Sequence, residues 1–163
     1  MREIKFRGLR LDRSEFVYGD LIHGVGSKNG RIYILPHKIN LAYVKDCHPL
    51  DGVEVISATI GQFTGLYDKT NWDNATESDR KYAYYLAKKN GTTPESEWKG
   101  KEIYEGDIIA LDDISCPITW DDGSFQMITN YNQGKSIAVQ ERVKAFKIIG
   151  KIHDNPELLN QQP

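Results

Sequence analysis

Carboxylates are the side chains in this sequence whose types and spacing could most readily support catalysis. Adjacent pairs occur at Asp112-Asp113 and Asp121-Asp122, and Glu105 lies two residues before Asp107. A hydrolase would need two such groups with separated pKa values facing one substrate. An aspartate beside a glycine is typical of turns, and Asp107 and Asp122 both have a glycine neighbour. We therefore predict no catalytic residues, and a small carboxylate-dependent hydrolase is the least favoured function.

Histidine, cysteine and glycine patterns give no support to a metal or cofactor site. The adjacent Cys47 and His48 would point to opposite sides of a strand, and no other histidine or cysteine has metal-ligand spacing. The glycine-rich loop over 23–30 precedes a strand-like segment, whereas a phosphate-binding loop needs a helix N-terminus after it. We therefore expect no metal and no cofactor.

Basic side chains gather in the first strand-like segment, at Lys5, Arg7, Arg10 and Arg13. A row of cations on one strand face could contact a nucleic-acid backbone. The net charge of the whole chain is −2, which disfavours binding through bulk charge, and a solvated strand edge is the simpler interpretation. The apolar pattern also changes phase at Gly8, which predicts a β-bulge there.

Aromatic residues concentrate between residues 70 and 98, in a segment that also carries helix signals. Asn74 or Thr76 could cap a helix that Gly91 would end, which predicts a helix over about 76–90. Helical spacing predicts that Tyr82, Tyr85 and Leu86 pack against the rest of the protein.

An interaction surface is the sharper hypothesis for this segment, because tyrosine and tryptophan contribute much of the energy of protein interfaces. Tyr84 lies out of phase with the two packed tyrosines, and Trp72 and Trp98 flank the helix. These three are the candidate interface residues.

Glycines and acids recur at the corners between strand-like segments. An aspartate after a glycine can accept backbone N–H bonds and fix the turn that begins the next strand. We therefore assign a structural turn role to six residues: Gly19, Asp20, Gly61, Gly65, Gly106 and Asp107.

The order of these phrases along the chain resembles the YopX family of phage and prophage proteins. The resemblance rests on residues 2–8, 17–21, 61–69, 100–109 and 149–159. It implies a mainly β fold, an origin in a phage or prophage, and an unknown function with no catalytic residues to carry over. Segment 70–97 interrupts the family pattern, so we expect it to be an insertion at an exposed turn.

The expected fold is mainly β, with small SH3-like or partly open β-barrels, one inserted helix and a short C-terminal helical turn. The chain would form one domain over 1–163, or two β subdomains at about 1–69 and 98–160 with the helical segment 70–97 between them. No apolar run reaches membrane-spanning length and no signal region opens the sequence, so we expect a cytoplasmic protein of a bacterial host cell.

The expected function is a non-enzymatic binding or assembly module, because the sequence lacks a catalytic constellation. Its partner would be an unidentified protein or a second copy of the chain, and we expect no membrane contact. A nucleic-acid accessory protein that uses the basic strand is the alternative.

Overall fold

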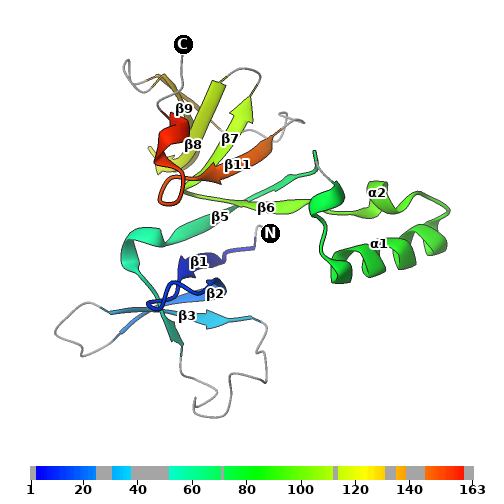
Figure 1. The fold of residues 1–163 in the computed structure, drawn as a ribbon, viewed down its shortest axis with the longest axis horizontal. Coiled ribbons are helices and arrows are strands. Elements are labelled where there is room, and N and C mark those ends of the chain that lie inside the picture. The colour runs from blue at the N-terminus through cyan, green and yellow to red at the C-terminus, as the bar shows by residue number, and fades with distance from the viewer. Residues whose placement is uncertain are drawn as a thin grey trace. The chain divides into compact units, whose positions relative to one another are not determined.

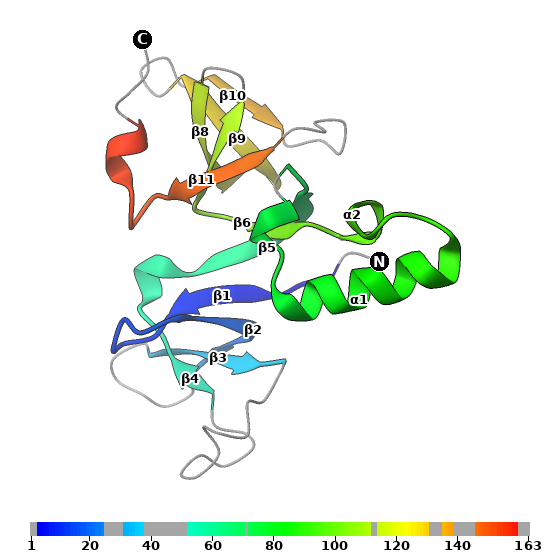
Figure 2. The same ribbon diagram turned by 45° about the vertical axis from the view of Figure 1, so that its right-hand side comes forward.

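The computed structural model describes residues 3–24, 31–37, 52–70, 72–111, 114–130, 135–138 and 146–159. This part of the chain contains two antiparallel sheets, neither of which closes on itself, and one long helix (Figures 1 and 2). The predicted mainly β fold class with one long helix is therefore confirmed, as is the short helical turn near the C-terminus.

The first sheet has six strands in the order β4-β3-β2-β1-β5-β6. Their bounds are β1 (Phe6–Leu9), β2 (Phe16–His23), β3 (Ile32–Pro36), β4 (Val53–Glu54), β5 (Gly61–Asp68) and β6 (Lys101–Tyr104).

The second sheet has five strands in the order β10-β9-β8-β7-β11. Their bounds are β7 (Asp107–Leu111), β8 (Ile114–Asp121), β9 (Ser124–Asn130), β10 (Lys135–Ala138) and β11 (Lys147–Lys151).

Helical elements occupy the connections. The α-helices are α1 (Glu77–Asn90) and α2 (Pro94–Glu97), and the 3-10 helices are η2 (Ser57–Thr59), η3 (Trp72–Asn74) and η4 (Pro156–Leu159). Among the described residues, none of these helices has the length and apolar character that crossing a membrane requires.

Contacts divide the chain into two compact units. The first unit is Met1–Phe63 with Tyr104–Gly106, and the second is Thr64–Ile103 with Asp107–Pro163. Strands β5 and β6 contribute residues to both units. The second unit contains the whole helical segment, and the assignment of that segment as an insertion into one domain stays a prediction.

In the first unit, β1 carries a buried arginine. Arg7 is 5% exposed, and its guanidinium carbon lies 5.3 Å from the centre of the Phe16 ring and 5.0 Å from that of Tyr104. Its Nη2 also donates a hydrogen bond of 3.2 Å to the carbonyl oxygen of Glu105. Aromatic faces and a carbonyl oxygen both favour a cation, so these contacts offset part of the cost of burying the charge.

The predicted bulge at Gly8 is wrong. Strand β1 pairs with β2 in an unbroken antiparallel register, from Phe6 opposite Gly19 to Leu9 opposite Phe16. A Cβ at Gly8 would lie 2.9 Å from the side chain of Val55, so the glycine allows close packing of Val55 against the strand.

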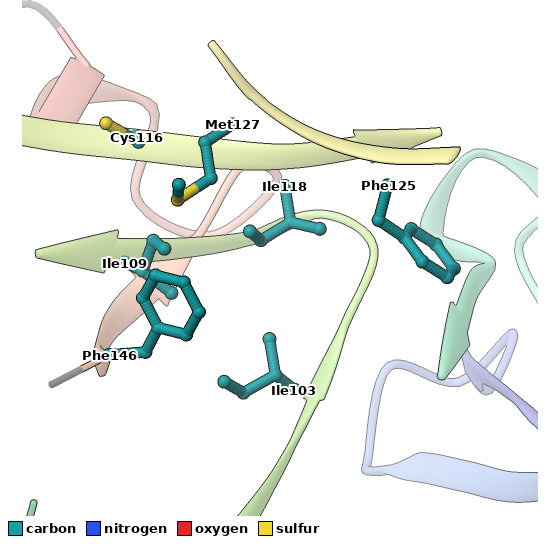
Figure 3. Close-up of a cluster of buried hydrophobic side chains, with 7 residues drawn as sticks. All are labelled: Ile103, Ile109, Cys116, Ile118, Phe125, Met127 and Phe146. Atoms are coloured by element: carbon teal, nitrogen blue, oxygen red, sulfur yellow. The ribbon is translucent and has the colours of Figure 1, made fainter. Parts of the chain in front are cut away.

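The core of the second unit is an aliphatic and aromatic cluster. Side chains from β6, β7, β8 and β9 converge on it together with Phe146, which directly precedes β11 (Figure 3). The buried members are Ile103, Ile109, Cys116, Ile118, Phe125, Met127 and Phe146. The turn between β8 and β9 has positive φ at Asp122 (46°) and Gly123 (74°), the geometry of a two-residue hairpin that follows the right-handed strand twist.

Cys116 should be chemically inert while the protein is folded. Burial raises the pKa of its thiol above the usual value, so little of the reactive thiolate forms near neutral pH. We expect iodoacetamide to modify Cys116 at least about 100-fold more slowly in buffer than in denaturant, because the reaction requires opening of the core. Peptide mass mapping at pH 8 would measure both rates, and similar rates in the two solvents would contradict the buried position.

Helix α1 begins and ends where the local sequence predicts. The hydroxyl of Thr76 accepts a hydrogen bond of 3.1 Å from the backbone N–H of Asp79, and the Asp79 carboxylate accepts one of 3.3 Å from the backbone N–H of Thr76. This capping box satisfies two N–H groups at the helix start. Gly91, with φ of 70°, ends the helix and donates to the carbonyl oxygen of Ala87.

Candidate interaction surface

The helical segment of the second unit packs around two tryptophans. The rings of Trp72 and Trp98 meet edge to face, with centroids 5.6 Å apart and an interplanar angle of 72°. Trp98 is 6% exposed and forms a buried cluster with Ala75 and Ala83. The helical segment thus has a small apolar core of its own.

Arg80 connects the start of α1 to the preceding 3-10 helix. Its guanidinium carbon lies 5.4 Å from the centre of the Trp72 ring, and its Nη2 donates a hydrogen bond of 2.9 Å to the carbonyl oxygen of Asp73. Its Nε donates a second hydrogen bond, of 3.2 Å, to the carbonyl oxygen of Ala75. Together with the capping box, these contacts fix the direction in which α1 leaves η3.

The packed face of α1 is made of small residues. Ala83 is 1% and Ala87 is 6% exposed, and their spacing of four residues places them on the same side of the helix. The short alanine side chains let the α1 backbone approach the tryptophans closely. This face was not predicted from the sequence because helical periodicity was judged from the large apolar residues. Two alanines four positions apart, near two tryptophans, were the signal that indicated it.

Three tyrosines of α1 are exposed instead of packed, and we call the half of the helix surface over which they are spread the tyrosine face. The exposed fractions are 60% for Tyr82, 60% for Tyr84 and 63% for Tyr85. The prediction that Tyr82 and Tyr85 pack against the protein is therefore wrong, because the alanines occupy the packed side of the helix. Of the predicted interface residues, Tyr84 lies on this face, whereas Trp98 is buried beneath α1 and Trp72 is half-buried beside it.

A shallow hollow lies beside Tyr82, between α1 and the segment that follows α2. It has a volume of about 80 Å³ and is lined by residues that include Asp79, Trp98 and Lys99. This volume is far below the roughly 300 Å³ at which small-molecule sites begin. The nearby Glu97 carboxylate accepts hydrogen bonds from the Thr92 hydroxyl and the Asn90 amide, and these lower the pKa of its carboxyl group. Glu97 therefore connects α2 to the end of α1.

The basic residues of the N-terminal strand do not form a single exposed face. Arg7 is buried, and the Lys5 ammonium lies 4.9 Å from the centre of the Phe63 ring with its side chain 12% exposed. Arg10 pairs with Asp12 at 3.2 Å, and Arg13 lies in the following turn with φ of 56°. The prediction that these four side chains form one strand surface is therefore corrected, because Lys5 and Arg7 pack on aromatic rings.

Four of the six predicted turn residues lie inside strands. Gly19 and Asp20 are in the middle of β2, and Gly61 and Gly65 are in β5. A Cβ at Gly19 would overlap the carbonyl oxygen of Leu35, and one at Gly61 would overlap that of Glu105. Gly19 and Gly61 therefore let the backbone of a neighbouring segment approach their own strand closely. The prediction that these two glycines form turns is corrected accordingly.

The remaining pair lies between β6 and β7. Gly106 has φ of 80°, a conformation that glycine adopts without strain, and Asp107 begins β7 with 1% of its surface exposed. Glu105 lies in the same turn and accepts the Arg7 hydrogen bond through its backbone carbonyl. Across the described ranges, no three histidine, cysteine or acidic side chains gather as metal ligands would.

Comparison with known proteins identifies one family. The model of the YopX family, described as "YopX protein", matches residues 73–160. The matched range includes α1, the β6–β7 turn and all of the second sheet, and it begins within the segment that the resemblance treated as an insertion. A search of curated proteins finds no match. Because the matched range covers more than half of the sequence and contains the phrases over 100–109 and 149–159, the chain belongs to the YopX family.

Proposed function

We propose that this YopX-family chain is a phage- or prophage-encoded binding or assembly module without enzymatic activity. Its contact surface is the tyrosine face of α1. The observation that carries the proposal is the exposure of Tyr82, Tyr84 and Tyr85, each at least 60% accessible on a single capped helix.

Tyrosines placed in this way are suited to recognition. Each ring provides a large apolar area and a hydroxyl group, and it loses little rotational freedom on binding. A helix held at both ends presents these rings in a fixed arrangement, which lowers the entropy cost of association. The alanine side of α1 and the tryptophan pair supply that support.

The charge of the segment favours a protein partner over nucleic acid. Residues 72–99 contain five acidic and five basic side chains, so the segment carries no excess of positive charge. A surface that binds phosphates usually gathers several unmatched cations. The nucleic-acid alternative would rely on the N-terminal strand, where Lys5 and Arg7 pack on aromatic rings.

Affinity capture tests the proposal. The immobilised protein would be exposed to extract from cells that carry the phage, with and without nuclease treatment. We expect the immobilised wild-type protein to retain a specific protein from the extract, or free copies of the chain when these are added. Replacing Tyr82 and Tyr85 together with alanine should reduce the affinity at least about tenfold, the scale of a lost interface hot spot.

Tyr18→Ala is the matched control, because Tyr18 is 46% exposed in the first unit and far from α1 in sequence. Capture should survive this substitution and nuclease treatment. Equal capture by the Tyr82→Ala, Tyr85→Ala double variant would contradict the assigned surface. Capture that disappears after nuclease treatment would favour the nucleic-acid alternative instead.

A further inference from the structure

The exposed side of α1 has the pattern of a helix-pairing seam. Ser78, Tyr82, Tyr85 and Lys89 are all exposed and follow one another at spacings of four, three and four residues. At 3.6 residues per turn these positions form one stripe along the helix, opposite the packed Ala83 and Ala87. We call these four residues the central stripe.

The central stripe is symmetric about the middle of the helix. Tyr82 and Tyr85 lie on either side of the midpoint of Glu77–Asn90, and Ser78 and Lys89 lie at equal distances farther out. Two copies of α1 placed antiparallel about a two-fold axis would therefore bring Tyr82 of each copy against Tyr85 of the other. A two-fold interface requires this kind of self-complementary surface.

A second set of side chains beside the central stripe is also symmetric, about a midpoint one residue nearer the N-terminus of α1. Glu77, Lys81, Tyr84 and Lys88 lie on one flank of the stripe, and all four are exposed. In the antiparallel arrangement, Glu77 would lie about 3 Å along the helix axis from Lys88 of the second copy, and Lys81 would have the same offset from Tyr84, which these long side chains can span. Within one helix, Glu77 and Lys81 form an ion pair of 2.7 Å. Each contact between the two copies occurs twice, and each is attractive as an ion pair or a cation–π contact.

The helix ends add to this complementarity. Acidic side chains occupy the first turn of α1 and Lys88 and Lys89 occupy the last. In an antiparallel pair, each basic end would lie beside the acidic start of the other helix. A parallel pair would instead place like charges together, so the charge pattern selects the antiparallel arrangement.

We propose that the partner of the tyrosine face is a second copy of this chain, bound through antiparallel pairing of the two α1 helices. The inference rests on the proposed function and names the partner of the same surface. A helix of 14 residues is about 21 Å long, which gives a small interface. The association is therefore expected to be weak and to depend on protein concentration.

Charge reversal at positions 77 and 88 tests this arrangement. Glu77→Lys would place lysines opposite one another at two sites of the dimer, and Lys88→Glu would do the same with glutamates. Sedimentation velocity over a range of concentrations should show that either substitution raises the dimer dissociation constant about tenfold or more. Circular dichroism would establish that each variant keeps the helical content of the wild type.

Rescue provides the specific readout. An equimolar mixture of the two single variants should form a heterodimer, because both cross-helix contacts then join opposite charges. The Glu77→Lys, Lys88→Glu double variant should dimerise with itself for the same reason. Glu95→Lys is the control, since Glu95 is an exposed acid on α2, outside the central stripe, and its reversal should leave dimerisation unchanged.

Three results would overturn the inference. The protein could sediment as a monomer at all concentrations, the dimer could be insensitive to both reversals, or the mixture and the double variant could fail to restore it. If a tyrosine-dependent complex with another protein is still captured in any of these cases, the proposed function stands and only the second-copy partner is refuted.

Discussion

Replacing Trp98 with alanine is expected to lower the free energy of unfolding of the second unit by about 3–5 kcal/mol. Trp98 is 6% exposed, it meets Trp72 edge to face, and it belongs to the cluster that includes Ala83 of α1. Its removal leaves a large cavity in a small core that cannot collapse without moving the helix. Urea unfolding followed by circular dichroism would measure the loss.

Tyr84→Ala is the matched control on the same segment. Tyr84 is 60% exposed, so its truncation removes little buried area and should change stability by no more than about 0.5 kcal/mol. If the tryptophan pair supports the tyrosine face, Trp98→Ala should also weaken partner capture although Trp98 itself is buried. Equal unfolding midpoints for the wild type and Trp98→Ala would show that the tryptophan pair does not hold α1 in place.

Gly61→Ala is expected to destabilise the first unit by about 3 kcal/mol or more. The added Cβ would overlap the carbonyl oxygen of Glu105, and both groups belong to backbone that a side-chain rotation cannot move. The hydrogen bond of 2.9 Å from the Glu105 N–H to the Gln62 carbonyl oxygen lies next to this contact and would be strained as well. Thermal unfolding should show a lower midpoint and reduced cooperativity.

Gly91→Ala separates this steric effect from the general cost of removing a glycine. A Cβ at Gly91 would have no atom within 4 Å, and only its φ of 70° disfavours alanine. That conformation costs about 1 kcal/mol, so Gly91→Ala should be markedly milder than Gly61→Ala. Equal losses from the two substitutions would contradict the close approach of the two backbones at Gly61.

Local signals predicted part of this fold well. Of the two candidate N-caps, Thr76 begins α1, and Gly91 ends it as predicted, because capping depends on residues within a few positions of each helix end. The turn at Asp122-Gly123, between β8 and β9, followed equally from its residue types, because a two-residue turn with positive φ has a narrow choice of residues.

Contacts between distant parts of the sequence explain what could not be predicted. Arg7 is buried because Glu105 and Tyr104 approach it, and Glu105 lies 98 positions away along the chain. The roles of Gly19 and Gly61 also depend on residues that are distant in the sequence, Leu35 and Glu105. A glycine in a strand-like segment is compatible with a turn or with close backbone approach, and only the neighbouring strand decides between them.

The tyrosine face was predicted only in part. Helical periodicity treats tyrosine as an apolar residue and so assigned Tyr82 and Tyr85 to the packed side of α1. The packed side is set by Ala83 and Ala87, whose small size suits the tryptophan core. Tyrosine has both an apolar ring and a polar hydroxyl, so its sequence position alone does not determine whether it is buried.

The tyrosine face of α1 is the contact surface that we propose for this YopX-family protein. Chemical iodination of tyrosines would test this assignment, with the modified sites mapped by mass spectrometry in the isolated protein and in its captured or self-associated complex. We expect modification of Tyr82 and Tyr85 to fall several-fold in the complex while Tyr18 reacts as before. Unchanged modification of both α1 tyrosines in a complex that is fully formed would contradict it.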